Sequence, residues 1–232
     1  MSETEPAPGA QRFIPPDAVT LDELRTASGG CRGCELYRDA TQTVFGRGDE
    51  HARVVFVGEQ PGDMEDRHGL PFVGPAGRLL RQAVDEAGLD PRELYITNAV
   101  KHFRHERRGT RRIHKTPDQT HVVACRPWLV AEFARLHPEV VVVLGATAAR
   151  ALLGPSFRVT RSRGVLLPWP DSAHRPQDFA RVPVGPTGQR ESVPATRLVA
   201  TIHPSAVLRA DDRETAYAGL VADLKVAAGA LR

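Results

Sequence analysis

The sequence of 232 residues lacks any apolar run close to the roughly 20 residues that a membrane-spanning helix requires. Its first residues, MSETEPAPGAQRF, are acidic and rich in proline and alanine, and they lack the hydrophobic segment of a signal peptide. We therefore expect a cytoplasmic protein that does not engage a membrane. Residues 1–18 are expected to form a disordered tail and residues 19–232 a single domain.

Cysteine is scarce, since only Cys31, Cys34 and Cys125 occur. An odd number of cysteines in a chain without an export signal argues against a disulfide framework. Cys31 and Cys34 are separated by two residues, a spacing that suits two thiolates on one metal ion or cluster. A thioredoxin-type redox pair follows a strand, whereas this pair precedes the first convincing strand. The spacing therefore favours metal binding over redox chemistry.

The chain has little excess charge of either sign, and its net charge of +3 indicates no class of partner. The distribution of charge is more informative, because residues 104–115 contain six Arg and Lys residues against one acid, Glu106. Such a cluster favours phosphate contacts, although a solvated charged loop is the simpler alternative. The stretch RRIHKTP, residues 111–117, places His114 in this basic segment, which we expect to be a surface loop.

Apolar strand patterns alternate with helical patterns, and no internal repeat is present. The predicted strands are residues 54–57, 94–100, 140–144 and 198–202, and the predicted helices are residues 76–87, 118–136, 146–153 and 213–231. Residues 164–194 are expected to hold a strand and a long variable loop. This alternation predicts an α/β fold with three layers, in which helices flank a central, mainly parallel four-stranded sheet.

Three polar motifs follow predicted strands. GEQPGD (residues 58–63) follows the first strand, NAVKH (98–102) ends the second, and HPS (203–205) follows the fourth. In parallel α/β folds ligands bind beyond the carboxyl ends of the strands. We therefore expect these motifs to meet in one site.

Together the motifs resemble the uracil-DNA glycosylase superfamily. The segments GEQPG (58–62), LPFVGPAG (70–77), TNAVK (97–101) and HPS (203–205) are similar to those of its iron–sulfur class, family 4. The resemblance extends from about Cys31 to the last predicted helix. Two departures are similar to the UdgX subgroup: His102 stands where family 4 has its fourth cluster cysteine, and the longer basic loop carries His114. Members of that subgroup become covalently attached to uracil-containing DNA through this histidine.

The resemblance implies a uracil-binding set of Gly58, Phe72, Asn98 and His203. Phe72 would stack on the base, and the Asn98 amide would donate to one atom of the uracil edge and accept from the next. His203 would donate to uracil O2 as negative charge develops there. The simpler alternatives are a core phenylalanine, a turn asparagine and a structural histidine.

The same resemblance places Glu59 and Gln60 close to the sugar C1′. Glu59 would steady the sugar cation and orient His114. Gln60 is neutral and is not a general base, so water activation would be weak. Asp63 is a supporting catalytic candidate, with a solvated loop aspartate as the alternative.

His114 is the expected nucleophile. A neutral imidazole held beside C1′ has an effective molarity of about 10⁵ M or more, so it would outcompete water at ~55 M. The product would be a bond between the histidine and C1′, with one turnover per molecule. The expected DNA-binding residues are Arg111, Arg112, Lys115 and Ser205.

Cys31, Cys34, His102 and Cys125 form the expected ligand set for a metal centre. Three thiolates and one imidazole suit a 4Fe–4S cluster or, as the alternative, zinc. The resemblance favours iron–sulfur, in a structural role. His105 and His121 are alternative fourth ligands.

The expected function is that of a monomeric uracil-DNA glycosylase of the UdgX type, acting preferentially on single-stranded DNA. The first alternative is an ordinary family-4 glycosylase with multiple turnovers. The second is a metal-stabilised module that binds nucleic acid without catalysis.

Overall fold

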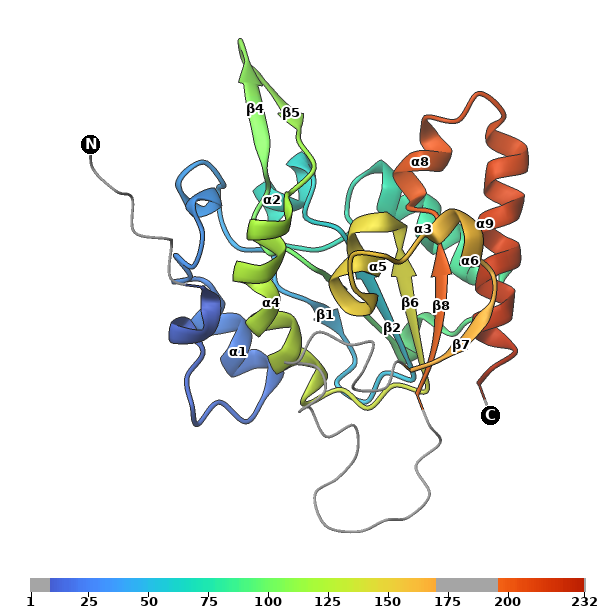
Figure 1. Cartoon of the computed structure of the whole chain (residues 1–232), viewed down its shortest axis with the longest axis horizontal. Coiled ribbons are helices and arrows are strands. Elements are labelled where there is room, and N and C mark those ends of the chain that lie inside the picture. Colours follow the sequence, from blue (N-terminus) through green and yellow to red (C-terminus); the bar gives the residue numbers. More distant parts are fainter. Residues whose placement is uncertain (1–8, 170–195, 232) are drawn as a thin grey trace.

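The computed structural model describes residues 9–169 and 196–231, so most of the predicted variable loop at 164–194 lies outside the described residues. A six-stranded sheet of order β1-β3-β2-β6-β8-β7 forms the centre of the molecule (Figure 1). Its four inner strands are parallel: β3 (Leu94–Asn98), β2 (Val54–Gly58), β6 (Val140–Leu144) and β8 (Arg197–Thr201). The predicted α/β fold with a mainly parallel sheet is confirmed.

Two short strands extend the sheet beyond the four that were predicted. β1 (Arg47–Gly48) pairs antiparallel with β3, and β7 (Leu166–Pro168) pairs antiparallel with β8. β7 is the strand expected at the start of residues 164–194. β1 was not predicted, because a two-residue strand of arginine and glycine has no apolar pattern.

Helices cover both faces of the sheet. α3 (Pro75–Glu86) and α9 (Arg213–Ala228) pack on the face that carries Phe56 and Val142. α1 (Leu21–Ser28), α4 (Gln119–Phe133) and α5 (Gly145–Leu153) pack on the face that carries Val55 and Val143. Because alternate residues of a strand point to opposite faces, this division creates two cores and three layers.

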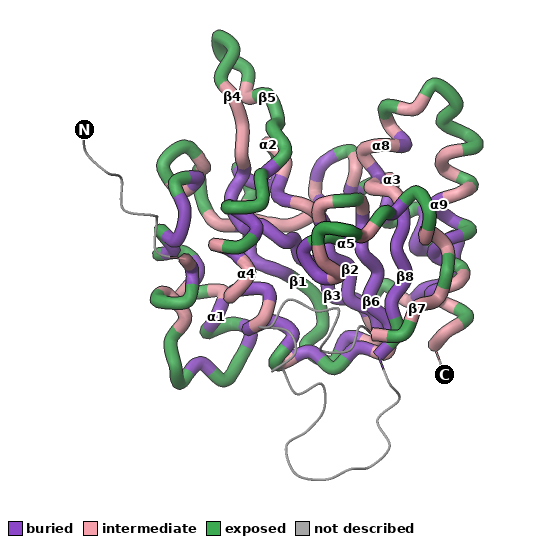
Figure 2. The backbone as a smooth tube through the Cα atoms, viewed as in Figure 1, coloured by how far each residue is buried: buried purple, intermediate pink, exposed green. Residues whose placement is uncertain are grey.

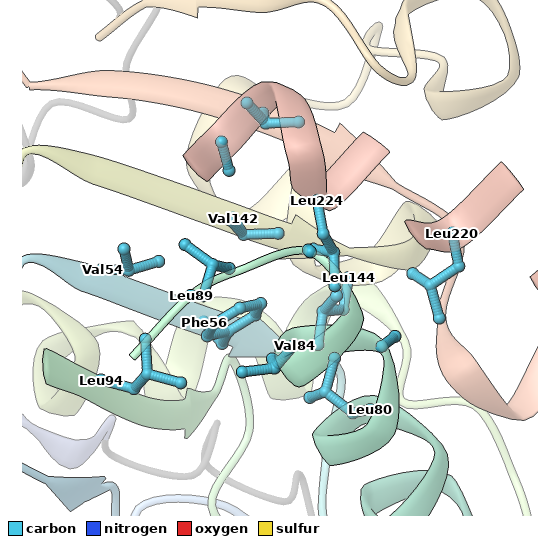
Figure 3. Packing of buried hydrophobic residues seen from close by; sticks show 14 of the residues in the cluster. Val54, Phe56, Leu80, Val84, Leu89, Leu94, Val142, Leu144, Leu220 and Leu224 are labelled. Atoms are coloured by element: carbon cyan, nitrogen blue, oxygen red, sulfur yellow. The ribbon is translucent and has the colours of Figure 1, made fainter. Parts of the chain in front are cut away.

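The central strands are buried on both faces (Figure 2). In one core, side chains of α3 such as Val84 and of α9 such as Leu224 belong to the same buried cluster as Phe56 (Figure 3). Full burial explains why β2 and β6 are unbroken apolar runs rather than alternating patterns. The remaining short elements are η1 (Ala10–Phe13), η2 (Glu35–Arg38), η3 (Pro91–Glu93), α2 (Asp63–His68), α6 (Val159–Ser162) and α8 (Pro204–Leu208).

The packed part of the chain begins earlier than the predicted boundary at residue 19. η1 lies against α4, and both Ala10 and Ala18 are buried. Residues 1–8 lie outside the described residues.

The basic segment is a β-hairpin, so the prediction of a surface loop is wrong. β4 (His105–Arg108) pairs antiparallel with β5 (Arg111–His114), and the hairpin projects from the body of the molecule (Figure 1). Gly109 has a φ of +59°, which suits the first position of a two-residue hairpin turn. Charged side chains occupy most positions of both strands, so the apolar alternation that signals a strand is missing.

Within the described ranges, no helix combines the length and apolar character needed to cross a membrane.

Candidate active site

A cavity of about 500 Å³ opens at the carboxyl ends of the parallel strands, as the strand-end motifs predicted. Segments that are distant in sequence line it: the chain after β2, Phe72 with the start of α3, the end of β3, the base of the hairpin, the junction of β6 with α5, and the residues at both ends of α8. Of the expected site residues, the cavity wall contains Glu59, Gln60, Phe72, Asn98, His114, His203 and Ser205.

Asn98 is the most buried polar group of the cavity wall. The residue is 2% exposed, and its Oδ1 has no hydrogen-bond partner among the described residues. A buried acceptor without a partner is costly, and each such atom in a native protein calls for an explanation. A ligand N–H in the cavity would satisfy Asn98 Oδ1.

Gly58 has no side chain and therefore leaves room for the side chains of Asn98 and Phe72. A Cβ added at Gly58 would lie 2.3 Å from Asn98 Oδ1 and 2.8 Å from Phe72 Cζ. A side chain at this position would therefore displace both groups from the cavity wall.

We expect Gly58→Ala to reduce uracil release from DNA by about 100-fold or more, since small misplacements of a binding group have effects of this size. Release of free base under single-turnover conditions is the measurement. Gly88→Ala is the matched control: Gly88 has a φ of +76°, so alanine is strained there, but nothing lies within 4 Å of an added Cβ. The steric account fails if Gly58→Ala releases uracil as fast as Gly88→Ala.

Phe72 is held in an unfavourable backbone conformation. Its φ of +55° makes it the one described non-glycine residue with positive φ. Gly77 of α3 permits this geometry, because a Cβ there would lie 1.7 Å from the Phe72 carbonyl oxygen. The residue is 6% exposed, and its ring centroid is 5.8 Å from that of His203. Backbone strain of this kind concentrates at functional sites, and here it supports an aromatic wall of the cavity.

Ser205 determines the tautomer of His203. The Ser205 backbone N–H donates to His203 Nδ1 at 3.1 Å, so Nδ1 is an acceptor and the neutral ring carries its proton on Nε2. Burial lowers the pKa of His203 to about 4, and the nearby His114 and Arg209 act in the same direction. His203 is therefore a neutral donor above about pH 4. The Ser205 hydroxyl lies 2.8 Å from the same Nδ1, so Ser205 orients His203 instead of pointing toward a DNA backbone.

Gln60 fastens the hairpin to the end of β2. Its Oε1 accepts from the Arg104 N–H at 2.9 Å, and its Nε2 lies 3.2 Å from the Arg104 carbonyl oxygen and 3.0 Å from that of Lys115. These contacts join the two ends of the hairpin. They fit an anchor rather than the catalytic role expected for Gln60.

His114 points from the hairpin toward the cavity. Its Nε2 lies 3.4 Å from Glu59 Oε1 and 2.9 Å from Gln60 Nε2. The carboxylate favours a proton on this nitrogen, whereas the amide nitrogen of Gln60, which only donates, favours a lone pair. Burial lowers the pKa of His114, with Glu59 opposing and Arg209 reinforcing this effect. The imidazole is thus neutral at neutral pH and has a lone pair available.

Arg112 is paired within the protein. Arg112 and His114 are two residues apart on β5 and therefore face the same way, toward the body. The Arg112 side chain is 9% exposed, its Nε lies 2.5 Å from Asp63 Oδ1, and its Nη1 lies 2.6 Å from Asp66 Oδ2. Burial by itself would raise the pKa of Asp63, but hydrogen bonds from Arg67 and Arg112 lower it. The geometry therefore favours neither the phosphate contact expected of Arg112 nor the catalytic role expected of Asp63.

The other basic residues of the hairpin differ in whether they are free to contact DNA phosphates. Lys115 pairs with Glu106 at 2.7 Å. Arg111 and Arg107 are exposed and have no charged partner among the described residues, so both are free to contact phosphate. Arg107 was not predicted as a DNA-binding residue. Composition does not show which face of a hairpin a residue occupies or which acidic residues it pairs with. Arg209, a cavity residue that no motif marks, was not predicted either.

The three cysteines gather in one buried cluster. Trp128 Nε1 donates to Cys31 Sγ and the Lys101 N–H to Cys125 Sγ, both at 3.2 Å. Burial raises the pKa of Cys34 to about 11 and that of Cys125 to about 12, and the neighbouring thiols add to this effect.

The fourth expected ligand is less well placed. His102 is buried, and burial lowers its pKa to about 4 against the opposing effect of Asp66. In the part of the chain that the structure describes, no three His, Cys, Asp or Glu side chains adopt a metal-binding arrangement. The donor set nevertheless fits a metal in its chemistry, because a cation stabilises thiolates that burial disfavours.

The cavity lies within the part of the chain that matches a known protein family. The model of the uracil DNA glycosylase superfamily matches residues 45–225, which include every segment that lines the cavity. The chain is 38% identical over 140 residues to the type-4 uracil-DNA glycosylase of Thermotoga maritima, covering 60% of this chain and 69% of that protein. It is 33% identical over 155 residues to the type-4 uracil-DNA glycosylase of Sulfurisphaera tokodaii, covering 65% and 67%. The chain therefore belongs to the uracil-DNA glycosylase superfamily.

Proposed function

We propose that the protein excises uracil from DNA and then becomes linked to the deoxyribose C1′ through His114, as the resemblance to the UdgX subgroup implies. Superfamily membership and relatives named type-4 uracil-DNA glycosylases support the excision step. The observation that carries the covalent step is the position of His114, which lies beside Glu59 in the same cavity as Asn98 and His203.

Uracil recognition follows from the donors and acceptors of the cavity. The unpartnered Asn98 Oδ1 accepts from uracil N3–H, and the amide nitrogen of the same side chain donates to O4. The Nε2–H of His203 donates to O2. Cytosine has an acceptor at N3 and a donor at C4, so it would leave the Asn98 amide mismatched on both atoms.

The covalent step balances without an external reagent. The bond between uracil N1 and C1′ breaks, and its electron pair leaves with the base, where the His203 hydrogen bond stabilises the negative charge. A ring nitrogen of His114 donates its lone pair to the cationic C1′. The ring then loses its remaining N–H proton, which balances the proton that the uracil anion gains.

A denaturing gel of the protein with uracil-containing single-stranded DNA separates the candidate functions. The proposed reaction produces a shifted protein–DNA band together with free uracil. Free uracil and an abasic strand without a shifted band would indicate an ordinary glycosylase with multiple turnovers. The proposal includes a preference for single strands, because an unpaired base is extruded at lower cost, and it includes a monomeric protein.

We also propose that Cys31, Cys34 and Cys125, with His102, hold a 4Fe–4S cluster that stabilises the fold. The clustering of three buried thiols supports this assignment. Protein purified without oxygen should contain about four iron atoms and four sulfides per chain. Cys125→Ser should lose the iron and melt at a lower temperature, whereas His105→Ala should retain the iron. Stoichiometric zinc would favour the alternative metal. A wild-type protein that contains no metal and melts at the same temperature as Cys125→Ser would contradict both metals.

A further inference from the structure

Glu59 lies between two different elements at the edge of the sheet. It follows β2, and β2 runs between β3 and β6. The hairpin follows β3 in the chain, and α5 follows β6 directly (Figure 1). The Glu59 side chain therefore has the hairpin on one side and the first turn of α5 on the other.

Each oxygen of the Glu59 carboxylate meets one of these elements. Oε1 lies 3.4 Å from Nε2 of His114. Oε2 accepts a hydrogen bond of 2.5 Å from the Thr147 hydroxyl, in the first turn of α5. A hydroxyl bonded to a carboxylate forms a short, charge-assisted hydrogen bond that is stronger than a neutral one.

We propose that Thr147 is a positioning residue for Glu59, so that the free oxygen of the carboxylate faces His114 and the sugar. This inference rests on the proposed function and deepens it. The Thr147 hydroxyl binds one oxygen of the Glu59 carboxylate. This hydrogen bond fixes the plane of the carboxylate, which would otherwise rotate because the glutamate side chain is flexible. The first turn of a helix also favours nearby negative charge, so α5 is a favourable neighbour for the carboxylate.

Loss of the Thr147 hydroxyl should change the position of the Glu59 carboxylate and little else. Valine has nearly the same shape and branching as threonine but has no hydroxyl. In Thr147→Val the cavity walls and the hairpin anchor remain, while Glu59 is free to rotate away from C1′. The hydrogen bonds of the described residues join Thr147 to Glu59 and not to Asn98 or His203, the groups proposed to bind uracil.

The test compares single-turnover rates of uracil release and of band formation with the affinity for uracil-containing single-stranded DNA. We expect Thr147→Val to slow both rates by about 10- to 100-fold, as a misplaced catalytic group does, with a Kd for DNA within about twofold of the wild type. Thr147→Ser keeps the hydroxyl and should recover most of the rate. Thr160→Val makes the same chemical change at an exposed threonine of α6 and should have no effect.

A second measurement distinguishes positioning from a general structural role. In a Glu59→Gln background, Thr147→Val should cause little further loss, because residues that act through one another are not additive. Equal losses in both backgrounds, or wild-type rates in Thr147→Val, would overturn the inference. Uracil release without a shifted band in the wild type would reject the covalent step alone, since Thr147 is still judged on the rate of release.

Discussion

His114→Ala should abolish the shifted protein–DNA band while uracil release continues. The alanine variant retains the base-binding groups, and the hairpin is still anchored by Gln60 and by the pair of Arg112 with Asp63. Without the imidazole, water becomes the nucleophile. The rate of release is expected to fall by about tenfold to 1,000-fold, because water at ~55 M replaces a group of much higher effective molarity.

The measurement combines a denaturing gel with chromatography of free uracil from the same reaction. His105→Ala is a matched control, because His105 pairs directly with His114 across the hairpin and stacks on Phe103 at 4.9 Å. This variant should keep the band. A band that persists in His114→Ala would place the linkage on another residue and remove the central claim of the proposed function.

Glu132→Ala should lower the free energy of unfolding by about 3–5 kcal/mol. Glu132 and Lys101 have fully buried side chains, and their charged atoms are 2.6 Å apart. Glu132 also accepts hydrogen bonds from the hydroxyls of Tyr95 and Thr97. The alanine variant leaves the Lys101 ammonium buried without its counter-ion, which costs more than the pair itself contributes.

Thermal and denaturant unfolding measure this effect, and the melting temperature should fall by about 6–20 °C. Glu106→Ala, which removes an exposed partner of Lys115, should change stability by less than about 1 kcal/mol. The double variant Lys101→Met, Glu132→Leu should recover part of the loss, since an apolar pair needs no charge compensation. Equal stabilities of Glu132→Ala and Glu106→Ala would contradict the buried-pair account.

The central sheet was predictable because its strands are buried on both faces. A short apolar run such as Val140–Leu144, which stands between two helical patterns, predicts a buried strand of a parallel sheet. The hairpin was not predictable in the same way. Its register is supported by ion pairs of Arg112 to Asp63 and Asp66, which lie 49 and 46 residues earlier in the chain. Periodicity does not report contacts of this kind.

The residues of the site also divide into those that the sequence predicted and those that it did not. Convergence of Glu59, Asn98 and His203 followed from strand ends in a parallel sheet, and the structure brings these residues together. The roles of Arg112 and Gln60 depend on which way a hairpin strand faces. A one-residue change of register would reverse that orientation, so a loop prediction offered no basis for separating Arg111 from Arg112.

The cysteine spacing predicted clustering but not a complete ligand set. Cys31 and Cys34 are close in sequence, whereas Cys125 reaches them only because α4 packs on the N-terminal segment. His102 is buried near Asp66, an arrangement that its position in the NAVKH motif did not reveal.

The cavity wall draws on residues from Glu59 to Arg209, and no contiguous stretch of the chain contains the whole of it. During synthesis, a ribosome-bound chain that has not yet released α8 has neither His203 nor Arg209 in place. Under the proposed function each molecule reacts once, so premature reactivity would waste it. The proposed reaction therefore requires that the chain has been synthesised through α8 and has folded.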